Sequence, residues 1–102
     1  MNDKNQILFV VTHPDAAVYL LGMGLAASRR GIKFSIFFTG DGVLALSNNG
    51  DQLKPVTDAA TEAIVCEHAW QDRLGESVCA LKMGSQTDNS RMIGAIDKVV
   101  SL

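Results

Sequence analysis

Short apolar runs alternate with longer mixed stretches along the chain, and this alternation predicts the class of fold. Residues 6–12 (QILFVVT) form a continuous apolar run, which is typical of a central parallel strand buried on both faces. Further runs follow at 33–39, at Ala63–Cys66 and at 98–102. Because stretches of helical length separate these runs, the pattern predicts a single α/β domain: a three-layer, open and mostly parallel sheet with helices on both faces.

The stretch 16–30 predicts the longest helix. It is apolar around most of its circumference, so one face can cover the sheet while an excess, Leu20 and Met23 among it, remains for contact with another subunit. We expect Thr12 or His13 to cap this helix. The same prediction puts the next two residues, Pro14 and Asp15, in its first turn.

Turn-forming residues mark the segments between the runs. The only loop predicted from them is 47–55 (SNNGDQLKP), because Asn-Asn-Gly-Asp is a turn cluster. Segment 76–82 is compatible with a strand or a helical turn, and extended structure is favoured. A final helix is expected over 90–96, and its candidate caps are Thr87, Asp88 and Asn89.

Composition narrows the classes of function. Of the 102 residues, 47% are hydrophobic and 20% are charged, and the formal net charge is −2. This balance provides no basic surface for nucleic acid, and no apolar run reaches the roughly 18 residues of a membrane span. The opening MNDKNQ has no signal-peptide pattern, so a cytoplasmic location is expected, in which the two cysteines are free thiols.

Cys66 stands where the run Ala63–Cys66 gives way to a predicted short helix that ends at Gly75. The carboxyl ends of parallel strands are where α/β sheets bind ligands and perform chemistry. Unpaired N–H groups at a helix start favour an anion, here the thiolate, although Glu67 and Asp72 oppose it. Cys66 is therefore the candidate reactive thiol, and a cysteine that only packs in the core is the competing interpretation.

Several motifs occur together in one known family. They are a first strand ending in Thr-His, an apolar helix closed by Arg-Gly, the sequences FFTGDGV and IDKVV, and the segment around Cys66. In this order they resemble the DsrE/DsrF-like family, which includes the TusD-type subunits of sulfur-relay complexes. The resemblance covers nearly the whole chain and implies a flavodoxin-like fold. Segment 47–62 is shorter than in family members, which predicts that a helix covering the sheet is missing.

The resemblance implies a sulfurtransferase that holds sulfane sulfur as a persulfide on Cys66 and passes it to an acceptor thiol, without a cofactor. It also implies sulfur donor and acceptor proteins as partners, and assembly into a trimer or hexamer or with paralogous subunits. The residues considered for the pocket around Cys66 are His13, Asp41, His68 and Arg73. Two alternatives stay open: a non-catalytic structural or interaction subunit, and a small-molecule binding module at the carboxyl edge of the sheet.

Two groups of residues have the types of side chain that bind zinc, but too few of them. His13-Pro14-Asp15 resembles the zinc-binding start of the LmbE-like deacetylases, yet Ala16 replaces the second acid and no later His-x-x-His follows. Cys66, His68 and Cys79 have poor spacing for one cation and lack a fourth ligand. No metal is therefore expected.

Overall fold

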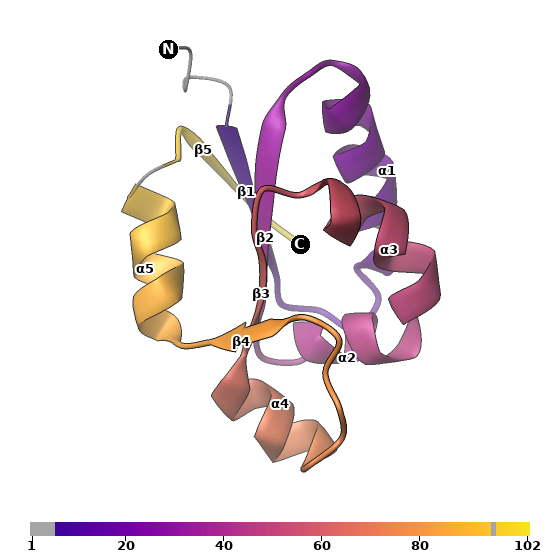
Figure 1. Ribbon diagram of the computed structural model, residues 1–102, viewed down its shortest axis with the longest axis vertical. Coiled ribbons are helices and arrows are strands. Elements are labelled where there is room, and N and C mark those ends of the chain that lie inside the picture. Colours follow the sequence, from indigo (N-terminus) through magenta and orange to yellow (C-terminus); the bar gives the residue numbers. More distant parts are fainter. Residues whose placement is uncertain (1–5, 95) are drawn as a thin grey trace.

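The computed structural model describes residues 6–94 and 96–102, and these contain five strands and five helices (Figure 1). The strands are β1 (Gln6–Val11), β2 (Lys33–Phe38), β3 (Ala63–Cys66), β4 (Lys82–Gly84) and β5 (Lys98–Ser101). The helices are α1 (Ala17–Arg29), α2 (Gly42–Asn48), α3 (Gly50–Ala59), α4 (Glu67–Leu74) and α5 (Gln86–Gly94). Most of the opening MNDKNQ, and position 95 in the expected final helix, lie outside the described residues.

The strands form one parallel sheet in the order β4-β3-β2-β1-β5. The connections from β1 to β4 all step in one direction along the sheet, whereas the connection from β4 to β5 returns across it. Right-handed crossovers then place α1 and α3 on one face and α5 on the other, which is the arrangement seen in Figure 1. The predicted three-layer α/β fold is confirmed.

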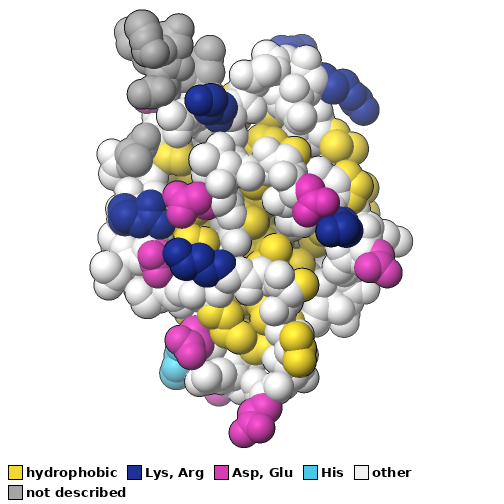
Figure 2. All heavy atoms as spheres, viewed as in Figure 1, with side chains coloured by type: hydrophobic (Ala, Val, Ile, Leu, Met, Phe, Trp, Pro, Cys, Tyr) yellow, Lys and Arg dark blue, Asp and Glu magenta, His cyan; other side chains and the backbone are white. Residues whose placement is uncertain are grey.

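The core lies on both faces of the three central strands. Leu8 and Val11 of β1, and Ile36, Phe37 and Phe38 of β2, are completely shielded from solvent. Charged side chains lie at the two sides of the face seen in Figure 2, and apolar side chains reach the surface along its middle. Helices cover both faces of the sheet, so side chains on both sides of β1 and β2 are buried. This explains why these central strands are apolar without alternation.

The largest departure from the sequence prediction is segment 47–55, which is helical. Only Asn49 separates α2 from α3, so the predicted loop is wrong. Leu53 and Val56, three positions apart on α3, are both fully buried, and α3 packs against α1. Burial of this apolar pair outweighs the turn propensity of the segment and the presence of Pro55 inside the helix. The helix predicted to be missing over the sheet is therefore present.

The start of α1 also differs from the prediction. Ala16 occupies the cap position without a side-chain hydrogen bond, and the first turn has no acidic residue. Pro14 and Asp15 precede the helix, and Thr12 Oγ1 donates instead to the carbonyl oxygen of Leu102 at 3.0 Å. The predicted cap is therefore wrong, because Thr12 ties the end of β1 to the end of the chain.

The apolar excess of α1 includes Met23, as expected, but not Leu20. Leu20 is fully buried within the domain, so the prediction that it is left for a subunit contact is wrong. Val18 and Tyr19 are 77% and 65% exposed, and Met23 is 43% exposed. One face of α1 therefore presents large apolar side chains to solvent.

The segment after α4 is less regular than predicted. Extended structure was favoured for 76–82, but β4 begins only at Lys82. Helix α5 begins at Gln86, four residues before the predicted start. Ser85 fixes this earlier start, because its Oγ accepts a hydrogen bond from the backbone N–H of Thr87 at 3.2 Å.

Candidate functional site

Cys66 is the last residue of β3, and α4 follows it at once with no connecting loop. At this edge the chain leaves β3 towards α4, which lies beside α2, whereas it leaves the neighbouring β4 towards α5 on the opposite face (Figure 1). Where adjacent parallel strands send their connections to opposite faces, a crevice opens beyond their carboxyl ends. Cys66 therefore lies at the topological switch point of the sheet.

A hollow of about 410 Å³ occupies this crevice. Its lining combines the end of β3, the first turns of α4 and the junction of β4 with α5, and the residues are Cys66, Glu67, His68, Gln71, Gly84, Ser85 and Gln86. Most of these side chains are polar, and only Glu67 and His68 are acidic or basic. The hollow is therefore suited to a small polar group or a narrow chain segment that approaches the Cys66 sulfur.

Cys66 is one of the residues that line this hollow. The residue is only 5% exposed, and its neighbour across the β3–β4 pair is Gly84. The side-chain nitrogen of Gln86 lies 4.0 Å from Cys66 Sγ and 3.5 Å from Thr39 Oγ1. Asn89 Nδ2 donates to Gln86 Oε1 at 3.5 Å. Residues that follow β2 and β4, the two neighbours of β3, thus come together beside the Cys66 sulfur.

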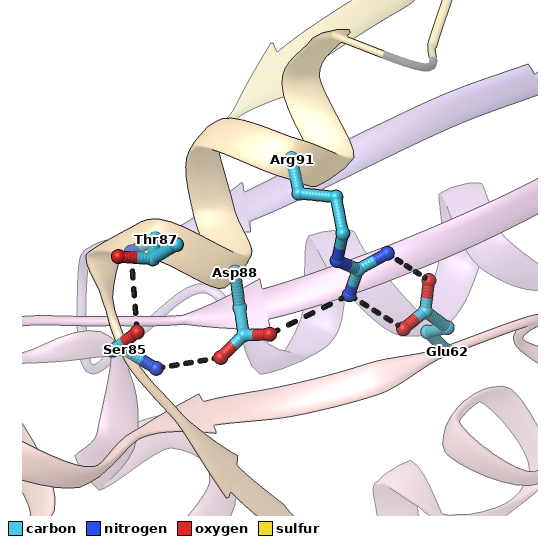
Figure 3. A network of polar contacts seen from close by, with 5 residues as sticks. All are labelled: Glu62, Ser85, Thr87, Asp88 and Arg91. Carbon is cyan, nitrogen blue, oxygen red and sulfur yellow. Dashed lines mark hydrogen bonds and ion pairs between the residues drawn. The ribbon is translucent and has the colours of Figure 1, made fainter.

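A network of polar contacts holds the turn from which Gln86 projects (Figure 3). The backbone N–H of Ser85 donates to Asp88 Oδ2 at 2.9 Å, and Thr87 N–H donates to Ser85 Oγ, so Ser85 and Asp88 form a capping box. Gly84 permits this approach, since a Cβ there would lie 2.5 Å from Asp88 Oδ2. The first turn of α5 is therefore fixed next to the sulfur.

Arg91 anchors the same helix to the other end of β3. Its guanidinium donates to both carboxylate oxygens of Glu62, at 2.9 and 3.1 Å, and lies 3.6 Å from Asp88 (Figure 3). Hydrogen bonding to Arg91 lowers the pKa of Glu62. The backbone N–H of Ser85 is the main cause that lowers the pKa of Asp88. Both carboxylates are therefore held in their ionised form.

The other candidate pocket residues have different positions. His68 lines the hollow, whereas Asp41 and Arg73 pair with each other at 2.8 Å and join the start of α2 to α4. His13 lines a separate hollow beside Tyr19 and the chain end at Leu102. The structure thus brings His68 to Cys66, but it does not bring the other three candidates into the lining.

The glycines of the Gly40-Asp41-Gly42 turn have a structural explanation. A Cβ on Gly42 would lie 1.9 Å from the carbonyl oxygen of Val11, so the turn needs a residue without a side chain where it passes the end of β1. This close approach is to backbone and not to a ligand site.

Cys79 differs from Cys66 in its surroundings. It lies in the irregular segment before β4, is half-buried and packs against the core. Burial raises the pKa of its thiol, although a backbone hydrogen bond at Leu81 acts in the opposite direction. Cys79 therefore resists ionisation at neutral pH.

Thr39 and Gln86 are site residues that sequence reasoning missed. The signal that could have located Gln86 is the Ser85-x-x-Asp88 capping box, which starts a helix directly after a short strand. Thr39 follows β2, so its place at the carboxyl edge follows from the parallel order of the sheet.

Within residues 6–94 and 96–102, no three His, Cys, Asp or Glu side chains lie together in a group that could hold a metal ion. Among the same described residues, no helix combines the length and apolar character needed to cross a membrane.

Comparisons of the chain with protein-family models, with curated proteins and with solved structures find no match. The DsrE/DsrF-like resemblance thus stays a prediction, and it rests on the motifs of the sequence alone.

Proposed function

We propose that the protein is a sulfurtransferase that holds sulfane sulfur as a persulfide on Cys66. The single observation on which this proposal rests is the position of the Cys66 sulfur. Cys66 lines a hollow at the switch point of the sheet, and its sulfur lies 4.0 Å from a side-chain N–H donor. A reactive thiol needs an approach path and a hydrogen-bond donor, and the hollow and the Gln86 amide support this role for Cys66.

The proposed reaction consists of two exchanges. In the first, the Cys66 thiolate attacks the outer sulfur of a donor persulfide, R–S–SH; the S–S bond of the donor breaks and R–S⁻ leaves, which gives Cys66–S–SH. In the second, an acceptor thiolate attacks the outer sulfur of Cys66–S–SH, and the Cys66 thiolate leaves. Each step forms one S–S bond and breaks one, so no external oxidant or reductant is consumed.

The proposed carrier acts in the reducing cytoplasm with separate donor and acceptor proteins, and as a trimer or hexamer or with paralogous subunits. Two features support assembly. Val18 and Tyr19 are exposed on α1, and an apolar hollow of about 340 Å³ between α1 and β5 has Met23 and Val100 in its lining. Exposed apolar surface of this kind commonly marks contacts between chains.

A non-catalytic subunit of the same fold is the second candidate, and the burial of Cys66 favours it. At 5% exposure the side chain belongs to the same buried cluster as Val65 and Ala69, where a cysteine serves as a small apolar residue. In this function the hollow would have no chemical role.

Intact-mass measurement after incubation with a low-molecular-weight persulfide separates the two candidates. We expect the protein to gain the mass of one sulfur atom and to lose it on reduction. The Cys79→Ser variant should behave in the same way, and Cys66→Ser should gain nothing while keeping its circular dichroism spectrum. If sulfur uptake survived in Cys66→Ser and were lost in Cys79→Ser, Cys79 and not Cys66 would be the sulfur-carrying thiol. No uptake by the parent protein would favour the structural subunit.

A further inference from the structure

The side chain of Gln86 belongs to α5 but reaches the ends of two strands of the sheet. Its side chain extends from the first residue of α5, across the carboxyl end of β4, towards the ends of β3 and β2. As a residue Gln86 is exposed to solvent, but its side chain also reaches the site. Here its amide nitrogen lies 3.5 Å from Thr39 Oγ1 and 4.0 Å from Cys66 Sγ.

The geometry makes Gln86 a donor towards the sulfur. A glutamine amide nitrogen has two hydrogens, so it can donate to the Thr39 hydroxyl oxygen and to the sulfur at once. The amide oxygen is occupied from the opposite side, because Asn89 Nδ2 donates to it. In this arrangement the nitrogen of the amide lies on the side of Cys66.

The turn that presents Gln86 is held on both sides. Asp88 accepts from the backbone N–H of Ser85, the residue before Gln86, and Arg91 links Asp88 to Glu62 at the start of β3 (Figure 3). In this network one arginine and two carboxylates together hold one short helix in position. The network therefore positions Gln86 relative to β3, the strand that ends in Cys66.

The charges around the sulfur make such a donor useful. On α4 the ionisable groups that line the hollow are Glu67, whose negative charge opposes a thiolate, and His68. From α5, the nearest carboxylate, Asp88, is engaged by Ser85 N–H and Arg91. Among the residues that the structure describes, no lysine or arginine is part of the lining. An amide donor beside the sulfur would therefore supply what a cation supplies at many reactive cysteines.

We propose that Gln86 donates an amide N–H to the Cys66 sulfur and stabilises its thiolate, with Asp88 and Arg91 as positioning residues. This inference deepens the proposed function and rests on it for its biological meaning. The thiolate is the attacking group when sulfur is loaded and the leaving group when sulfur is released. One contact would thus act in both exchanges.

The test uses alkylation of Cys66 by iodoacetamide in a Cys79→Ser background, in which Cys66 is the only thiol. We compare Gln86→Leu, which keeps the bulk but removes the donor, with Gln86→Glu, which replaces the donor by an anion. The matched control is Gln52→Leu, because Gln52 is an exposed glutamine of α3 that is not part of the lining of this hollow. Rates are measured from acid to alkaline pH.

Loss of a hydrogen bond to a charged group should slow alkylation at neutral pH by roughly tenfold in Gln86→Leu, and by more in Gln86→Glu. The rate profile of both variants should move to higher pH, whereas Gln52→Leu should remain within about twofold of the background at every pH. A shift of the profile reports ionisation, so easier access of the reagent to the sulfur would not imitate it. Arg91→Leu should give a smaller shift in the same direction.

An unchanged profile in Gln86→Leu would overturn the inference, and so would equal shifts in Gln86→Leu and Gln52→Leu. No sulfur donor is present in this assay. A protein that alkylates as expected but takes up no sulfur would refute the proposed function and leave the role of Gln86 standing. Sulfur uptake with an unchanged profile would refute only the role of Gln86.

Discussion

Two glycines of α1 give a direct test of how α1 packs on α3. Gly22 faces solvent, and a Cβ built on it meets nothing within 4 Å. Gly24 is buried, and a Cβ there would lie 2.6 Å from Val56 Cγ1 and 3.2 Å from Val56 Cγ2. The same substitution, Gly→Ala, therefore has opposite expected effects two residues apart.

The expected magnitudes follow from two terms. Alanine is favoured over glycine inside a helix by about 1 kcal/mol, so Gly22→Ala should raise the free energy of unfolding by about 0.5–1 kcal/mol. Gly24→Ala has the same gain but overpacks the contact with Val56, at a cost of about 1–3 kcal/mol. Val56 is fully buried, and a valine in a helix has one strongly preferred rotamer, so it cannot turn aside. We expect Gly24→Ala to be less stable than Gly22→Ala by about 1–3 kcal/mol.

Urea unfolding followed by the fluorescence of Trp70 measures both values at one fixed protein concentration. Trp70 is 4% exposed and its indole N–H donates to the carbonyl oxygen of Ser77 at 2.9 Å, so unfolding changes its surroundings strongly. The free energy of unfolding of the double variant Gly24→Ala/Val56→Ala should exceed the value expected from adding the two single effects by at least about 1 kcal/mol. The reason is that the new methyl group enters the space that Val56 leaves. Equal stabilisation by both glycine substitutions, without coupling to Val56, would refute this packing of α3 on α1.

Three further outcomes are expected. Cys66 should be alkylated faster than Cys79 in the folded protein at neutral pH, because burial raises the pKa of Cys79, and peptide mapping after brief labelling shows which thiol reacts. Arg91 lowers the pKa of Glu62 below its ordinary value of 4.5, so their pair should stabilise the fold above about pH 4.5 and lose this contribution as pH falls through the lowered pKa. Since Glu62 and Arg91 are 36% and 51% exposed, Arg91→Leu should lower the free energy of unfolding by less than about 1 kcal/mol at neutral pH and by almost nothing in acid. Urea unfolding at each pH measures this, and an equal loss at both pH values would contradict a stabilising ion pair. Light scattering should show a trimer or hexamer that Met23→Lys weakens, and a stable monomer at micromolar concentration would exclude this assembly.

The parts of the fold that could be predicted from sequence are those with a strong local signal. The apolar runs of β1, β2, β3 and β5 have few alternative interpretations, and their parallel pairing follows from the helical stretches between them. The segment of α3 was misjudged because SNNGDQ is rich in turn formers. Its helix depends on Leu53 and Val56 finding α1, which is a tertiary contact that propensity does not contain.

The candidate site shows the same difference between features with a local signal and features that depend on tertiary contacts. Cys66 was located correctly at the end of a strand because the change from apolar to polar residues is local. Gln86 is 20 positions away, and it reaches the sulfur only because β4 pairs with β3 and a capping box starts α5 at once. Asp41 and Arg73 were candidates on chemical type, but each neutralises the other at 2.8 Å. Sequence reasoning identifies residues with suitable chemistry more readily than it identifies their neighbours.

The absence of a loop between β3 and α4 has a consequence for how sulfur can move. Cys66 ends the strand and occupies the cap position of the helix, so its backbone is held from both sides and only the side-chain torsion is left to reposition the sulfur. A thiol on a flexible arm can travel between a donor and an acceptor. This thiol is fixed in place, and in the proposed exchanges the donor and then the acceptor must each extend a narrow segment into the hollow. The two partners would have to take turns at one opening, so sulfur transfer through this protein would be strictly sequential.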